Sequence, residues 1–163
     1  MREMCGTTVL LERRCGMRGI LFKAKTESGI WVEGDLLHYE SGEVAILERP
    51  FSKYGYEAVE ISRRTKVVPS TICQYTGLID KNGNKIWEND VVKYHFGNDV
   101  AHIRFGEYQS CFDSTKTGHI GFYVDWDCKK ALRKDLGYWV NMIDCNVIGN
   151  ILDNPDLLKG GAE

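Results

Sequence analysis

Histidine and cysteine side chains with the chemistry to ligate a metal ion are concentrated in the second half of the chain. The candidates are His95, His102, Cys111, His119 and Cys128. Zinc sites commonly contain closely spaced ligand pairs such as CxxC or HxxxH, and no pair among these residues has that spacing. Strand pairing can still bring distant ligands together, but surface histidines and core thiols explain the pattern without a metal. We therefore expect no metal and no other cofactor.

A cysteine nucleophile needs a base nearby, and Cys111 with His119 is the one pair separated by a plausible loop. No nucleophile motif surrounds Cys111, so a buried thiol is the simpler interpretation. Glu88 and Asp90 have turn spacing, and turn capping explains them without catalysis. The sequence also lacks a glycine-rich phosphate loop. It predicts a protein that is not an enzyme, and an enzyme that uses Cys111 and His119 is the third alternative.

Aromatic residues are unusually frequent in the second half, with eleven between Trp87 and Trp139. Core packing accounts for most of them. A small β domain cannot bury all eleven, so two or three should reach the surface. We choose Tyr108, Tyr123 and Trp126, with the neighbouring Lys129 and Lys130, as a candidate surface for a peptide, a partner subunit or single-stranded nucleic acid.

The net charge argues against a protein that binds duplex DNA nonspecifically. The chain has 21 Lys and Arg against 23 Asp and Glu, a net charge of −2, whereas binding phosphates needs a surplus of cations on one face. Short basic clusters such as Arg63-Arg64 and Lys129-Lys130 are typical of solvated edges or turns. Nucleic acid is therefore kept as a second class of partner, behind protein.

The cysteine count raises the question of the compartment, because six cysteines would suit a disulfide framework in a small secreted protein. The N-terminal apolar run Val9-Leu10-Leu11 is interrupted at once by Glu12-Arg13-Arg14, and it is far too short for a signal core. No stretch approaches the ~18 apolar residues of a membrane span. We expect reduced thiols, a cytoplasmic location and no membrane contact.

Hairpin signals dominate the chain. The expected strand pairs are 20–25 with 30–35 around a turn at Thr26–Gly29, Trp31–Tyr39 with Val44–Glu48, short strands on either side of Asn82-Gly83, and Asp90–Phe96 with Val100–Phe105. The Asn-Gly pair supplies the positive φ angles of a tight turn. Residues 51–62 have no clean period, which predicts a loop.

Helical signals are few and short. A helix is expected at Lys129–Leu136, followed by a closing strand at Val147–Leu152 and a one-turn helix after Asn154-Pro155. Closely spaced strands without long amphipathic helices predict a mostly β protein built from small barrels or a sandwich. The domain boundary is expected near residues 70–76.

Several uncommon sequence motifs resemble those of a known family. Residues 74–83 read QYTGLIDKNG and residues 86–92 read IWENDVV. With GILFKAK at 19–25, WVEGDL at 31–36 and VIGNI at 147–151, these words resemble the pattern of the YopX-like family of phage and prophage proteins. The usual family pattern has a glycine where this chain has Asn89, and asparagine tolerates the left-handed conformation that glycine would adopt in a turn.

The resemblance implies a β-rich fold of two unlike parts. These are an irregular N-terminal β domain at 17–72 and a small SH3-like β-barrel domain at 73–158, followed by a tail at 159–163. Family members start close to the first apolar strand, so residues 1–16 are expected to be a disordered extension or an upstream start. The family has no known biochemical function, so no catalytic residue is carried over.

We expect a phage- or prophage-encoded accessory protein in the cytoplasm of a bacterial host. It would act without catalysis, by association with another protein or by self-association into a homo-oligomer through exposed strand edges. The alternative is a nucleic-acid-binding module that uses the SH3-like half, where aromatic residues alternate with basic residues such as Lys93 and Arg104.

Overall fold

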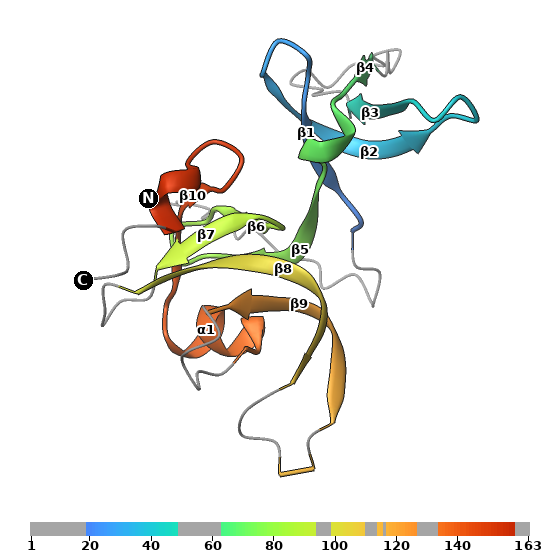
Figure 1. Cartoon of the computed structure of the whole chain (residues 1–163). Coiled ribbons are helices and arrows are strands. Elements are labelled where there is room, and N and C mark those ends of the chain that lie inside the picture. The colour runs from blue at the N-terminus through green and yellow to red at the C-terminus, as the bar shows by residue number, and fades with distance from the viewer. Residues whose placement is uncertain are drawn as a thin grey trace, which may run out of the picture.

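The computed structural model describes residues 19–48, 63–93, 99–109, 114–115, 117–126 and 134–158. Within these ranges the chain is mostly β, with two antiparallel sheets and a single α-helix (Figure 1). The predicted extension at 1–16, the loop at 51–62 and the tail at 159–163 lie outside the described residues. No described helix has the length and apolarity needed to cross a bilayer.

The first sheet has six strands in the order β4-β3-β2-β1-β5-β6. Their bounds are β1 Phe22–Lys25, β2 Trp31–His38, β3 Val44–Glu48, β4 Arg63–Lys66, β5 Cys73–Ile79 and β6 Lys85–Trp87. The second sheet has the order β10-β7-β8-β9, with β7 Asp90–Lys93, β8 Val100–Gln109, β9 Gly118–Asp125 and β10 Asn146–Asn150. The helices are α1 Leu136–Met142 and the 3₁₀ turns Pro69–Thr71 and Pro155–Leu158.

The two predicted hairpins at the front of the chain are confirmed. In β1 and β2 Phe22 pairs with Gly34, and β2 continues into a second hairpin with β3. Ala24 is buried with Ile46 and other apolar side chains in a small core. Because side chains alternate along a strand, Lys23 and Lys25 point to the opposite face of the sheet. Gly34 is required by close packing, because a Cβ there would lie 2.0 Å from the Leu47 carbonyl oxygen.

Two special backbone positions also agree with the sequence. The predicted Asn-Gly hairpin joins β5 and β6, with Gly83 at φ 84°. The carboxylate of Asp80 accepts the backbone N–H groups of Asn82 and Asn84 at 2.9 and 2.8 Å, which closes this turn. Asn89 has φ 66°, the left-handed conformation expected where the family pattern has glycine.

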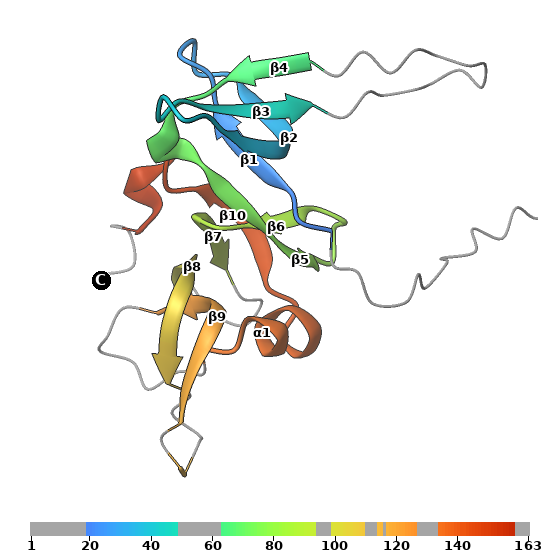
Figure 2. The same cartoon turned by 90° about the vertical axis from the view of Figure 1, so that its right-hand side faces the viewer.

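The described strands form two open sheets and do not close into the predicted SH3-like barrel. β5 pairs with β1, with Lys23 opposite Cys73, so the first sheet continues across the expected boundary between residues 72 and 73. Figure 2 shows β5 running from the N-terminal hairpins toward the second sheet. Because β5 and β6 belong to the first sheet, the later strands β7 to β10 remain an open four-stranded sheet in the described residues.

The helix begins later than predicted. Lys134 and Asp135 are not helical, and Asp135 forms a bridge with Tyr123, so α1 starts at Leu136, where the expected helix ends. Leu136 and Trp139 are one turn apart and both are buried in the main core, which explains the actual position. Residues 129–133 lie outside the described part. The predicted closing strand and the turn after Asn154 are found as β10 and the second 3₁₀ turn.

Candidate functional site

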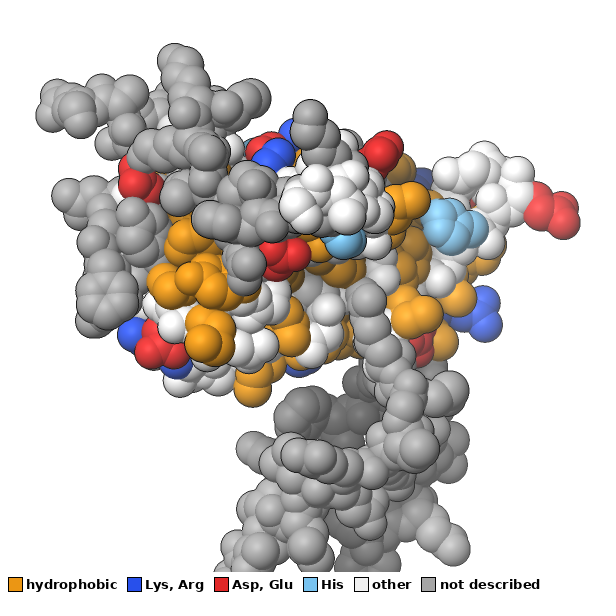
Figure 3. All heavy atoms as spheres, turned by 90° about the horizontal axis from the view of Figure 1, so that it is seen from below, with side chains coloured by type: hydrophobic (Ala, Val, Ile, Leu, Met, Phe, Trp, Pro, Cys, Tyr) orange, Lys and Arg blue, Asp and Glu red, His pale blue; other side chains and the backbone are white. Residues whose placement is uncertain are grey.

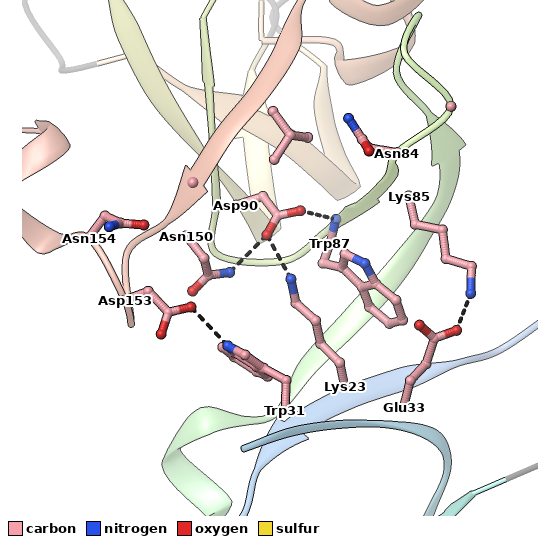
Figure 4. A pocket seen from close by; sticks show the side chains of 13 residues that line it. Lys23, Trp31, Glu33, Asn84, Lys85, Trp87, Asp90, Asn150, Asp153 and Asn154 are labelled. Carbon is pink, nitrogen blue, oxygen red and sulfur yellow. Dashed lines mark hydrogen bonds and ion pairs between the residues drawn. The ribbon is translucent and has the colours of Figure 1, made fainter. Parts of the chain in front are cut away.

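A cleft of about 680 Å³ lies between the two sheets, and we call it the intersheet cleft (Figure 4). The first sheet contributes Lys23 from β1, Trp31 and Glu33 from β2, and Lys85 and Trp87 from β6. The second sheet contributes Asp90 from β7 and Asn150 from β10, and Asp153 follows shortly after β10.

Strand alternation brings the first-sheet residues to one face. Ala24 points into the small apolar core, so Lys23 and Lys25 on either side of it project to the opposite face. The register places Lys23 opposite Glu33 and Lys25 opposite Trp31, so all four side chains share that face. The polar face of the first sheet therefore forms one wall of the cleft.

Lys23 lies at the centre of the cleft. Its ammonium Nζ is 2.9 Å from Asp90 Oδ1, 5.1 Å from the ring centroid of Trp31 and 5.2 Å from that of Trp87. An ammonium within about 6 Å of an aromatic ring gains a cation–π attraction that grows as water is excluded. Lys23 thus joins the first sheet to the second through one ion pair and two indole rings.

Asp90 is buried, and both of its carboxylate oxygens are engaged. Oδ1 accepts from Lys23 Nζ and from Asn150 Nδ2, each at 2.9 Å, while Oδ2 accepts the backbone N–H of Trp87 at 2.8 Å. Burial raises the pKa of the Asp90 carboxyl above its ordinary value, although the charge of Lys23 and these hydrogen bonds act to lower it. The arrangement suits an anchor between the sheets better than a general base.

The mouth of the cleft carries two further carboxylates. Asp153 accepts the indole N–H of Trp31 at 2.8 Å and pairs with Lys25 Nζ at 2.5 Å. The hydrogen bond from Lys25 is the main cause that lowers the pKa of Asp153. On the other side of Trp31 and Lys23, Glu33 pairs with Lys85 (Figure 4). Charge in the cleft is therefore nearly balanced.

The described residues offer little for nucleophilic or metal chemistry. Burial raises the pKa of the Cys73 thiol and raises that of Cys145 to about 11, so both thiols stay protonated near neutral pH. In the part of the chain that the structure describes, no three His, Cys, Asp or Glu side chains gather as metal ligands. The cleft is lined by indole rings, amides and paired charges.

The predicted surface of aromatic residues is only partly assembled. Tyr108 and Tyr123 stack at 5.3 Å, and Lys134 Nζ lies 5.5 Å from the ring centroid of Tyr123. Trp126 is a correction, because it is 2% exposed and packs on Trp139 at 4.6 Å inside the main core. Tyr123 is also nearly buried, and Tyr108 is half-buried. The predicted Lys129 and Lys130 lie outside the described residues.

The two candidate metal ligands that the structure describes are far apart. His102 pairs with Asp125 near the start of the β8 and β9 ribbon, and His119 lies opposite Tyr108 near its end. Six residues of strand separate His102 from Tyr108, which corresponds to about 20 Å. His95, Cys111 and Cys128 lie outside the described residues, so the Cys111 and His119 pair stays a prediction.

Exposed apolar side chains form a second surface feature, on the outer part of the β8 and β9 ribbon. Phe105 lies opposite Phe122, and their rings are 5.1 Å apart, while the nearby Ile120 is strongly exposed. The ribbon and α1 lie on the side of the molecule seen in Figure 3, where hydrophobic side chains cover much of the described surface. This face is separate from the intersheet cleft.

The cleft residues were not chosen from the sequence. A signal was present, because Lys23 and Lys25 alternate with apolar residues and therefore belong to the solvent side of a strand. Trp31, Trp87 and Asp90 also fall within the family words of residues 31–36 and 86–92. The sequence did not show that these motifs lie side by side in the folded chain.

Comparison with known proteins assigns the chain to a family. No curated protein shows significant similarity to the chain. A family model described as YopX protein matches residues 21–159, which is most of the chain. The matched region contains the cleft residues from Lys23 to Asp153 and the left-handed Asn89. The chain belongs to the YopX protein family.

Proposed function

We propose that the protein is a noncatalytic phage or prophage accessory protein that binds another polypeptide through the intersheet cleft, in the cytoplasm of the bacterial host. The observation that carries this proposal is the partly exposed Trp31, held between ion-paired carboxylates at the mouth of the cleft. Tryptophan is enriched among the residues that dominate binding energy at protein interfaces.

The state of the reactive groups supports a role without catalysis. Cys73 and Cys145 are buried thiols with raised pKa values, and both oxygens of Asp90 already accept hydrogen bonds. A general base or nucleophile needs an available proton acceptor within reach of the substrate. The carboxylates at the mouth of the cleft, Glu33 and Asp153, are ion-paired with Lys85 and Lys25.

The balance of charge supports a polypeptide partner over a nucleic acid. Among the residues that line the cleft, Lys23 and Lys85 face Glu33, Asp90 and Asp153, which leaves a net charge of −1. Phosphate binding needs a surplus of cations. On the β8 and β9 ribbon, Tyr108 stacks on Tyr123 and on His119, so protein side chains already cover part of the ring surface that bases would use.

The test is a selection of short peptides from a random display library on the purified protein. Peptides that bind the wild type should bind the Trp31→Ala variant about tenfold or more weakly. They should bind the Tyr39→Ala variant as tightly as the wild type. Tyr39 is a matched control because it is an exposed aromatic residue outside the cleft. Thermal unfolding of both variants verifies that they are folded. Peptide binding that ignores Trp31→Ala would overturn the proposal.

Light scattering with and without short single-stranded DNA separates the remaining alternatives. Self-association would appear as a defined oligomer that DNA does not change, and Phe105 and Ile120 are among the exposed apolar side chains that favour it. A mass that rises with DNA and falls back as salt is added would replace the proposal with nucleic-acid binding.

A further inference from the structure

Charges in the intersheet cleft, and at Lys25 beside it, lie at different depths. The side chains of Lys23 and Lys25 are 18% and 19% exposed, and that of Asp90 is 3% exposed. The carboxylate side chains of Glu33 and Asp153 are 43% and 41% exposed. The Lys85 side chain beside Glu33 is 42% exposed, so a molecule that enters the cleft meets two carboxylates and one ammonium, with a summed charge of −1, before it reaches the recessed ammonium groups of Lys23 and Lys25.

The outer carboxylates retain capacity to accept hydrogen bonds. A carboxylate offers about four lone-pair sites. The contacts described for Asp153 are one to Lys25 and one to the Trp31 indole N–H, and the contact described for Glu33 is with Lys85. The Glu33 and Lys85 pair is exposed on both sides, and such pairs contribute little stability, so an incoming cation can replace Lys85 at small cost.

The geometry favours arginine over lysine as the incoming cation. A guanidinium is planar, makes paired hydrogen bonds to a carboxylate and loses less hydration energy than an ammonium. Asp153 and Glu33 lie on either side of Trp31 and Lys23 (Figure 4). A segment that crosses the mouth of the cleft can place one arginine on each carboxylate while its backbone passes Trp31.

We infer that the intersheet cleft takes an arginine-bearing segment of a polypeptide, with Asp153 and Glu33 as the receiving carboxylates and Trp31 as the apolar contact between them. This inference rests on the proposed function and names the class of partner. In this arrangement the ion pair of Lys23 with Asp90 holds the two walls of the cleft together. The ion pair of Lys25 with Asp153 holds one of the receiving carboxylates in position.

The experiment uses the whole protein and three labelled probe peptides, Gly-Arg-Ser-Arg-Gly amide and its counterparts with Lys or Glu in place of both arginines. Fluorescence anisotropy should give the arginine peptide about fivefold tighter binding than the lysine peptide, and at least tenfold tighter binding than the glutamate peptide. Asp153→Asn and Glu33→Gln should each weaken the arginine peptide by about fivefold. Glu40→Gln makes the same charge change at an exposed turn outside the cleft and should have no effect.

Each outcome bears on the inference. Equal binding of the three peptides, tighter binding of the glutamate peptide, or insensitivity to both Asp153→Asn and Glu33→Gln would overturn it. Library peptides that depend on Trp31 but lack arginine would also overturn it, while the proposed function would stand. If no library peptide depends on Trp31, the proposed function itself fails. The use of two receiving carboxylates guards against a variant that merely unfolds.

Discussion

Replacing Lys23 with methionine removes the cation that faces the buried carboxylate of Asp90, and keeps an unbranched side chain. The variant loses the 2.9 Å ion pair and the approaches to the Trp31 and Trp87 rings at 5.1 and 5.2 Å. Breaking a fully buried pair costs about 3–5 kcal/mol. The Lys23 side chain is 18% exposed, so solvent screens part of its charge, and we expect a loss of about 2–4 kcal/mol at neutral pH.

The loss should shrink in acid, because Asp90 can then take up a proton. Burial raises the pKa of Asp90 above its ordinary value of 3.8, although Lys23 acts to lower it. The folded protein thus binds this proton more tightly than the unfolded chain. The resulting stability is complete below 3.8 and is lost as the pH rises through the raised pKa. Without Lys23 the pKa of Asp90 rises further, so the variant should recover more stability on acidification than the wild type.

The assay is urea unfolding of wild type and variant at about pH 7.5 and about pH 4.5. Lys66→Met is the matched control, because Lys66 forms an exposed 2.6 Å ion pair with Glu43 and its loss should leave stability unchanged. The reasoning is refuted if Lys23→Met behaves like Lys66→Met, or if its cost is the same at both pH values. Either result would mean that Lys23 and Asp90 do not couple the two sheets.

Substitutions at Gly34, Asn89 and Trp126 test the fold, each by chemical denaturation. Gly34→Ala should cost about 3 kcal/mol or more because its Cβ would collide with the Leu47 carbonyl, whereas Gly121→Ala, which has open space, should not show that loss. Asn89→Gly should change stability by less than about 1 kcal/mol and Asn89→Val should cost about 1–2 kcal/mol, because φ is 66° there; equal effects would contradict a left-handed residue. Trp126→Ala should cost about 3–5 kcal/mol, and a negligible loss would contradict its burial.

Local features of this chain follow from residues close together in the sequence. The alternation of apolar and polar residues from Phe22 to Lys25, the Asn82-Gly83 turn and the left-handed Asn89 all depend on period and backbone sterics, so the hairpins and these turns were predictable. The helix position was not, because Leu136 and Trp139 are selected by the core that they complete, and a short helix has little periodicity of its own.

Long-range pairing decided the rest. The sequence motifs that contain Lys23, Trp31 and Asp90 were visible, and Asp153 follows the motif at 147–151, yet Lys23 and Asp90 are 67 residues apart and Trp31 and Asp153 are 122 residues apart. They meet because β5 pairs with β1 and carries the chain from the first sheet to the second. Because of that pairing, β5 and β6 belong to the first sheet and the predicted barrel does not form in the described residues. Trp126 is buried in the main core, where the sequence predicted a surface residue. The sequence alone indicated most of the strands, whereas the tertiary structure decided which faces meet, because contact between distant segments depends on the whole folded chain.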